Sequence, residues 1–115
     1  MDTIDVLEQG ARLSYRFEEM QNYSGPGYPS GVAHAFKAMQ RAFPLLDGGR
    51  PPERREITLV TAFPGLGARD AFELVTHCVT DGRYLADKYL PEAVLEKCAF
   101  QAQRKSGENG LKILT

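Results

Sequence analysis

The sequence predicts an α+β fold in which two to three helices pack on a mixed four-stranded sheet, in the order α-α-β-α-β-β-β. Three observations lead to this class. The 115 residues suit a single domain spanning 1–115. Apolar residues recur at helical spacing in segments before residue 80. The later apolar runs are short and bounded by turn-forming residues, as strands are.

The first helix is expected over residues 2–20. Asp2 or Thr3 can cap it, and apolar residues recur every three or four positions as far as Met20. Gly10 weakens its middle by roughly 1 kcal/mol relative to alanine, so any break in the helix is expected there.

A loop and a second helix are expected next. Residues 21–30 contain two glycines, two prolines, asparagine and serine, a composition that cannot continue a helix. Ser30 can cap a helix over 31–43, whose buried face repeats at the helical period and which Pro44 follows.

The charged stretch 47–56 is expected to be a solvated loop. It carries Arg50, Arg54 and Arg55 among glutamates and two prolines, and mixed signs favour exposure to water. Residues 56–63 then form the clearest strand. Both of its faces are largely apolar, which is typical of a central strand covered on both sides.

The last part of the chain is predicted to hold one helix and three strands. The helix spans 68–79, where apolar residues make a broad arc, and Asp81-Gly82 ends it. The strands are expected over 84–89, 97–104 and 111–115. A short helical turn is expected at 90–96 and a hairpin loop at 105–110.

Composition limits the partners and the compartment. Fourteen Lys and Arg against fifteen Asp and Glu give a net charge of −1, so charge offers no reason to expect nucleic acid or an anionic membrane. Cys78 and Cys98 form no CxxC pair, and neither a signal peptide nor a membrane span is visible. A cytoplasmic protein with reduced thiols is expected.

Several segments carry a resemblance to a known family. The chain reads SGPGYPSG at 24–31, GLGARDA at 65–71 and THCVT at 76–80, and the strands at its end are paired. In these segments it resembles the FmdE-like family, which is related to formylmethanofuran dehydrogenase, over about residues 23–115. The resemblance implies that family's fold and a site region at the opening of the second helix.

The chain departs from that family at the metal ligands. The family pattern opens with His-Gly-His-x-Cys-Pro-Gly, has a Cys-Gly-x-Asp-Ala turn and continues with a helix that ends in Thr-Gly-Cys-Thr. Here Ser24, Pro26 and Tyr28 stand in the opening, the turn has no cysteine, and only Cys78 matches a family cysteine. Structural zinc needs about four nitrogen or sulfur ligands. The resemblance therefore implies a degenerate metal site, and no metal or other cofactor is expected.

The candidates for catalysis are Tyr28, His34, Asp70 and Cys78. His34 and Asp70 suit proton transfer. Cys78 would be a nucleophile or a pocket wall if a nearby cation lowered its pKa. Its spacing places it on an apolar arc, so the alternative is a buried small apolar residue. Tyr28 can cover a ligand or simply pack within its loop.

The candidates for ligand binding are Tyr23, Gly65, Gly67, Arg69, His77 and Arg83. The two glycines lie between a strand and a helix, where free N–H groups can bind an anion, although an ordinary tight turn has the same composition. Arg69 and Arg83 would clamp that anion, unless they are ordinary surface arginines. His77 is either a surface histidine or is oriented by Glu73, four residues earlier.

Together these residues favour a metal-independent small-molecule enzyme or ligand-binding protein, with a pocket at the 23–31 loop, the 65–70 turn and the end of the third helix. Enzymatic acid–base chemistry is favoured over binding alone, with the reaction class open. The alternative is a non-catalytic accessory protein, and in either case a homodimer is expected. A second alternative is a zinc protein, although His34, His77 and Cys78 have no metal-site spacing.

Overall fold

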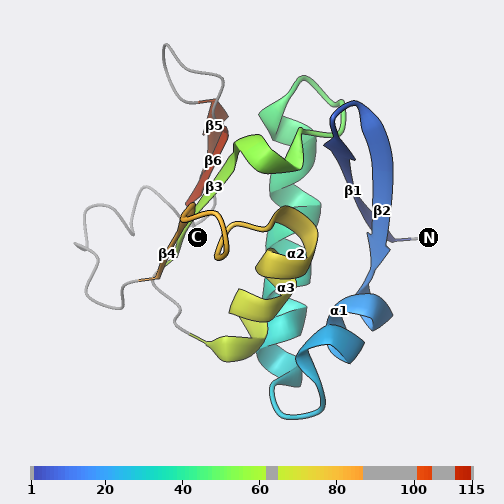
Figure 1. Ribbon diagram of the computed structural model, residues 1–115, viewed down its shortest axis with the longest axis vertical. Helices are drawn as coiled ribbons and strands as arrows, with labels where there is room; N and C mark the ends of the chain where they lie inside the picture. Colours follow the sequence, from blue (N-terminus) through green and yellow to red (C-terminus); the bar gives the residue numbers. More distant parts are fainter. Residues whose placement is uncertain (1, 62–64, 87–100, 105–110, 115) are drawn as a thin grey trace.

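Helix α2 (Pro29–Leu46) runs through the middle of the molecule, between a four-stranded sheet and a two-stranded hairpin (Figure 1). The computed structural model describes residues 2–61, 65–86, 101–104 and 111–114. Because α2 contacts strands of both sheets, half of its residues are buried. The expected α+β class is confirmed. No helix in the described ranges is long and apolar enough to cross a membrane.

The chain begins with a β-hairpin. Strand β1 (Thr3–Glu8) pairs antiparallel with strand β2 (Ala11–Arg16). Gln9 and Gly10 connect them with φ angles of 51° and 84°. Two positive φ angles are the backbone of a type I′ turn, whose twist matches that of the strands on either side.

The expected helix over 2–20 is therefore wrong. Ile4 and Val6 are buried while their neighbours in β1 are less so, which is the period of a strand. Ile4 also stands three residues before Leu7, so the same residues satisfy a helical spacing. The turn at Gln9 and Gly10 decides between the two patterns, because it fixes the register of a hairpin.

Helix α1 (Phe17–Ser24) follows β2 directly. The Arg16 amide donates a hydrogen bond to the Glu19 carboxylate at 2.9 Å, which satisfies a backbone donor at the start of the helix. Phe17 meets Phe36 of α2 edge to face, with ring centroids 5.7 Å apart. This contact fixes α1 against the central helix.

Helix α2 extends beyond the expected range at both ends. Pro29 occupies its first turn, where the missing N–H costs nothing, and Pro44 is accommodated near its C-terminal end. Many of the buried residues of α2 are small, namely Gly31, Ala35, Ala38 and Ala42. Small side chains allow neighbouring elements to approach this helix closely.

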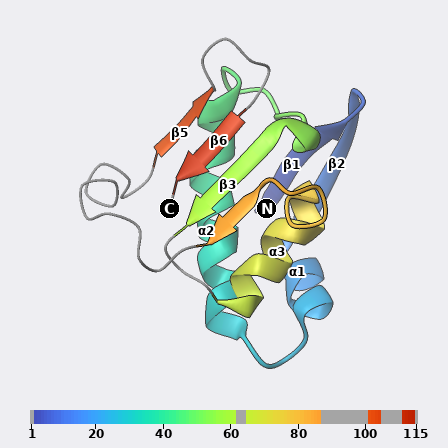
Figure 2. The same ribbon diagram turned by 60° about the vertical axis from the view of Figure 1, so that its left-hand side comes forward.

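Strand β3 (Ile57–Thr61) lies between β4 (Tyr84–Ala86) and β6 (Leu111–Leu114) and runs parallel to both (Figure 2). Strand β5 (Gln101–Arg104) pairs antiparallel with β6. Ile57 and Leu59 of β3 belong to the buried core.

The strands are thus divided between two sheets, so the expected single sheet and its element order are wrong. The difference arises from the hairpin, whose two strands form a sheet of their own on the far side of α2 (Figure 1). Several expected features lie outside the described residues: strand positions 62–63, 87–89, 97–100 and 115, the turn at 90–96 and the loop at 105–110.

Helix α3 (Leu66–Thr76) packs against α1 and α2. Its buried face includes Ala71, Phe72 and Val75, as the apolar arc predicts. The helix ends before the expected residue 79 because His77 adopts a left-handed conformation, with φ 60°. A residue in this conformation cannot continue a right-handed helix.

Candidate functional site

Two segments expected at the site meet where α2 and α3 begin. A Cβ placed on Gly67 would lie 2.5 Å from the Tyr28 carbonyl oxygen and 2.6 Å from the Tyr28 Cβ. A Cβ on Gly31 would lie 3.0 Å from the Ala68 nitrogen. Only glycine permits such an approach of two backbones. Gly67 is therefore a packing residue of the helix crossing, whatever else it does.

Exposed apolar and aromatic side chains lie on the helix ends at this end of the molecule. Tyr23 in the last turn of α1 is 53% exposed, Tyr28 before α2 is 47% exposed, and Leu66 at the start of α3 is 48% exposed. We call these three residues the helix-end patch. Figures 1 and 2 both show the end of α1 and the starts of α2 and α3 at one end of the molecule.

Other expected site residues lie in the first two turns of α2 and α3 or directly before them. His34 is exposed in the second turn of α2. Arg69 is exposed and Asp70 is half-buried near the start of α3, and Gly65 is the residue that precedes this helix. The proton-transfer candidates are thus on the helices whose N-termini bear the patch.

Cys78 lies at the other end of α3, directly after its C-terminus. Eleven residues of α-helix separate the two ends by about 16 Å. The thiol is fully buried. Burial raises the pKa of Cys78 to about 11, against the opposing effects of the Thr76 hydroxyl and the Arg83 charge. The protonated, enclosed thiol fits the buried apolar alternative and is a poor nucleophile.

His77 and Glu73 do not form the expected pair. The Glu73 carboxylate accepts hydrogen bonds from the amides of Val79 at 2.8 Å and Thr80 at 3.1 Å, and from the Thr80 hydroxyl. The His77 amide bonds to the Glu73 carbonyl at 2.8 Å. Glu73 therefore holds the chain after α3, and His77 provides the left-handed residue that ends the helix.

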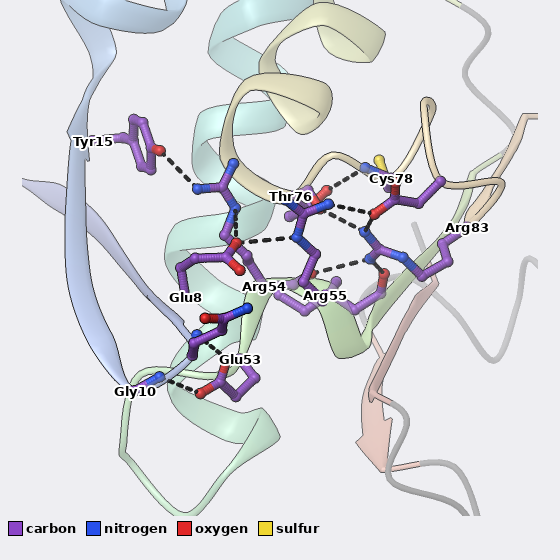
Figure 3. Close-up of polar contacts among 12 residues, drawn as sticks. Glu8, Gly10, Tyr15, Glu53, Arg54, Arg55, Thr76, Cys78 and Arg83 are labelled. Atoms are coloured by element: carbon purple, nitrogen blue, oxygen red, sulfur yellow. Dashed lines mark hydrogen bonds and ion pairs between the residues drawn. The ribbon is translucent and has the colours of Figure 1, made fainter.

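Arg83 binds backbone carbonyls instead of clamping an anion with Arg69 (Figure 3). Its guanidinium donates to the carbonyls of Thr76 at 2.7 Å and Arg54 at 3.0 Å, and also to that of Ile57. These partners lie at the C-terminal end of α3, whereas Arg69 lies in its first turn. Arg83 therefore joins α3 to the segment before β3.

A charged cluster that no sequence pattern indicated fixes the hairpin. The segment expected to be a solvated loop includes η1 (Arg54–Glu56), a short 3-10 helix in which Arg54 is only 6% exposed. Arg54 lies 3.5 Å from the Glu8 carboxylate and donates to the Tyr15 hydroxyl at 3.2 Å (Figure 3). Arg55 pairs with the same carboxylate at 3.0 Å and with Asp81 at 2.9 Å.

Glu53 extends this cluster to the hairpin turn. Its carboxylate accepts hydrogen bonds from the amides of Gln9 at 3.2 Å and Gly10 at 3.0 Å (Figure 3). The solvated-loop expectation is therefore wrong for Arg54, which is buried, whereas Glu53 stays partly exposed while it binds the turn. The partners of Glu53 lie more than 40 positions earlier in the chain, and no local sequence pattern reports contacts at that separation.

The residues at the expected degenerate metal site do not suit a metal ion. Tyr28 packs at the start of α3, and Cys78 is enclosed beyond the other end of this helix. Within the described residues, no three His, Cys, Asp or Glu side chains gather as a metal site requires.

In comparisons with known proteins, no protein-family model, no curated protein and no solved structure matches the chain.

Proposed function

We propose that the protein binds a small molecule at the helix-end patch, without a metal and without covalent chemistry at Cys78. The observation that carries the proposal is the contact between Tyr28 and Gly67. It joins two glycine-containing segments at the end of the molecule where Tyr23, Tyr28 and Leu66 are about half exposed. Exposed apolar side chains that gather on one surface often mark a binding site.

The patch favours a ligand with a flat apolar part and a hydrogen-bonding group. Tyrosine offers a ring face for stacking and a hydroxyl that donates and accepts. The helix amides contribute little to such binding, because Pro29 has no N–H and the first-turn residues Gly31 and Gly67 are buried in the crossing. If the ligand is also a substrate, proton transfer falls to His34 and Asp70, because the Cys78 thiol is protonated and enclosed.

Self-association is the second candidate, and the same exposed side chains favour it. An apolar patch on one protomer can cover its copy on another around a two-fold axis. In that case the protein is a homodimeric accessory protein and the patch is its interface.

We also propose that the chain is a divergent member of the FmdE-like family. The left-handed backbone of His77 supports this kinship, because the family pattern Thr-Gly-Cys-Thr places glycine at the matching position. A positive φ explains why a glycine would stand there. The order helix, strand, turn, helix over 29–76 also agrees with the pattern.

Native mass spectrometry of protein purified without added metal tests these proposals. Wild-type protein is compared with the patch variants Tyr28→Ala and Leu66→Ser, and with Leu45→Ser as control, since Leu45 is exposed on α2 outside the patch. Small-molecule binding predicts an organic adduct that both patch variants lose and the control keeps. Self-association predicts a dimer with the same pattern of losses. If no adduct or dimer forms, and a fragment library shifts no patch resonance in NMR spectra, both candidates are refuted.

A further inference from the structure

A hollow of about 220 Å³ lies between the hairpin, the second half of α2 and residues 49–52, away from the helix-end patch. Its floor is apolar, because Ile4, Met39 and Phe43 line it and are almost fully buried. Pro51 and Pro52 are part of its wall. Small-molecule sites usually measure roughly 300–1,000 Å³, so this hollow suits a single large side chain better than a whole ligand.

One edge of strand β1 opens onto the hollow. The Leu7 amide donates to the Pro52 carbonyl at 2.8 Å, so the backbone groups of Leu7 point away from β2. Directions alternate along a strand, and Thr3 and Asp5 therefore present their backbone groups to this same edge. At Leu7 this edge is covered by residues 52 and 53, which run parallel to β1. Thr3 and Asp5, nearer the start of the strand, line the hollow.

Two arginines stand at the rim of the hollow. Their side chains, on Arg12 and Arg50, are 63% and 80% exposed. The Nη2 atom of Arg12 donates a hydrogen bond to the Asp5 carboxylate at 2.6 Å, and the Nη2 atom of Arg50 lies 3.8 Å from the Asp47 carboxylate. A guanidinium has five N–H donors, so one such contact leaves others to bind a second carboxylate.

We propose that this hollow binds the C-terminal residue of an extended peptide from a partner protein. The apolar side chain of that residue occupies the hollow above Met39, and its backbone pairs with the edge of β1 at Thr3 and Asp5. Its terminal carboxylate is held by Arg12 and Arg50. Strand addition supplies the affinity, and the size of the hollow and the remaining guanidinium donors at its rim supply the specificity.

N-acetylphenylalanine is the smallest probe that carries the ring, the amide and the carboxylate together. In NMR titrations of the full chain we expect it to shift the amides of Thr3, Asp5, Gly49 and Arg50, with a dissociation constant in about the millimolar range. The uncharged N-acetylphenylalanine amide and the ring-free N-acetylalanine are each expected to bind about tenfold more weakly. If the three probes bind alike, the proposal is refuted.

A fourth probe, 3-phenylpropionate, keeps the ring and the carboxylate and lacks the amide. Weaker binding than N-acetylphenylalanine supports pairing with the strand edge. Equal binding would identify the hollow as a site for small aromatic acids and overturn the peptide assignment.

Matched arginine variants test the rim. Arg50→Gln is expected to weaken N-acetylphenylalanine about tenfold. Arg16→Gln is the control, because Arg16 lies on β2 outside the hollow and pairs with Glu19 at 3.8 Å. Equal affinities of the two variants would overturn the role of the rim. Unchanged amide spectra away from the substituted residues confirm that both variants fold.

Discussion

The close contact between the starts of α2 and α3 predicts that Gly67→Ala destabilises the protein. The added methyl carbon would lie 2.5 Å from the Tyr28 carbonyl oxygen and 2.6 Å from the Tyr28 Cβ. Ordinary van der Waals contacts begin at about 3.4 Å, so the overlap is close to 1 Å. The oxygen is a backbone atom and the Cβ is bonded directly to the backbone, so rotation of the tyrosine ring cannot remove the clash.

The size of the loss follows from two opposing effects. Forcing a methyl group into a packed contact costs about 1–3 kcal/mol. Alanine regains up to about 1 kcal/mol over glycine inside a helix, and less in a first turn such as that of Gly67. The expected net loss is about 1–2 kcal/mol, a substantial part of the stability of a small domain.

Urea unfolding followed by far-ultraviolet circular dichroism measures this loss. With a slope of about 1.5 kcal/mol per molar urea, the midpoint of Gly67→Ala should fall by about 1 M. Gly27→Ala is the matched control, since a Cβ on Gly27 meets no atom within 4 Å and its φ is not in the left-handed region. Its stability should be unchanged or slightly raised. Equal midpoints for the two variants would refute the contact on which the site depends.

Other consequences concern the opposite end of the molecule. Glu8→Gln should cost about 3 kcal/mol in urea unfolding because it leaves the buried Arg54 without its carboxylate, whereas Arg55→Gln at the exposed partner should cost less than about 1 kcal/mol. Equal costs would contradict a buried ion pair. Burial raises the pKa of Glu73, but the hydrogen bonds it accepts outweigh burial and leave that pKa below the ordinary 4.5. Its stabilising effect is therefore present above about pH 4.5 and is lost as pH falls further. Glu73→Gln should lack this acid-dependent loss in a pH series of unfolding midpoints, and an identical series would count against the capping role. Cys78, whose pKa burial raises to about 11, should escape iodoacetamide at about pH 7.5 until denaturant is added. Peptide mapping that finds it alkylated in native protein would show that the thiol is accessible.

The sequence was informative where periodicity was unambiguous. Val32, Ala35, Phe36 and Met39 fit only a helix, and α2 is found there. The first segment was ambiguous, because Ile4 satisfies a helical and a strand spacing at once. Such ambiguity is resolved by the turn, and Gln9-Gly10 is a weaker signal than Asn-Gly, the usual type I′ pair.

The site was predictable in part for a similar reason. The sequence predicted an anion site or a tight turn at Gly65 and Gly67, whereas Gly67 lies inside α3 and packs against the Tyr28 backbone. The sequence could not say that the group approaching Gly67 is Tyr28 rather than a ligand. The burial of Arg54 was beyond prediction, since it depends on Glu8 and Tyr15 arriving from the hairpin. A charged side chain is buried only when distant partners offset its desolvation, and those partners are a property of the fold.

The two ends of α3 differ in a way that separates stability from binding. At its C-terminal end the polar groups of Glu73 and Arg83 are engaged by hydrogen bonds, and Cys78 is enclosed. At its N-terminal end, glycine backbones pack together while Tyr28 and Leu66 stay half exposed. A side chain that contributes little to burial in the monomer can be replaced at little cost to folding. Substitutions in the helix-end patch should therefore weaken binding or association with little effect on the free energy of unfolding. Substitutions beyond Thr76 should lower the free energy of unfolding with little direct effect on binding.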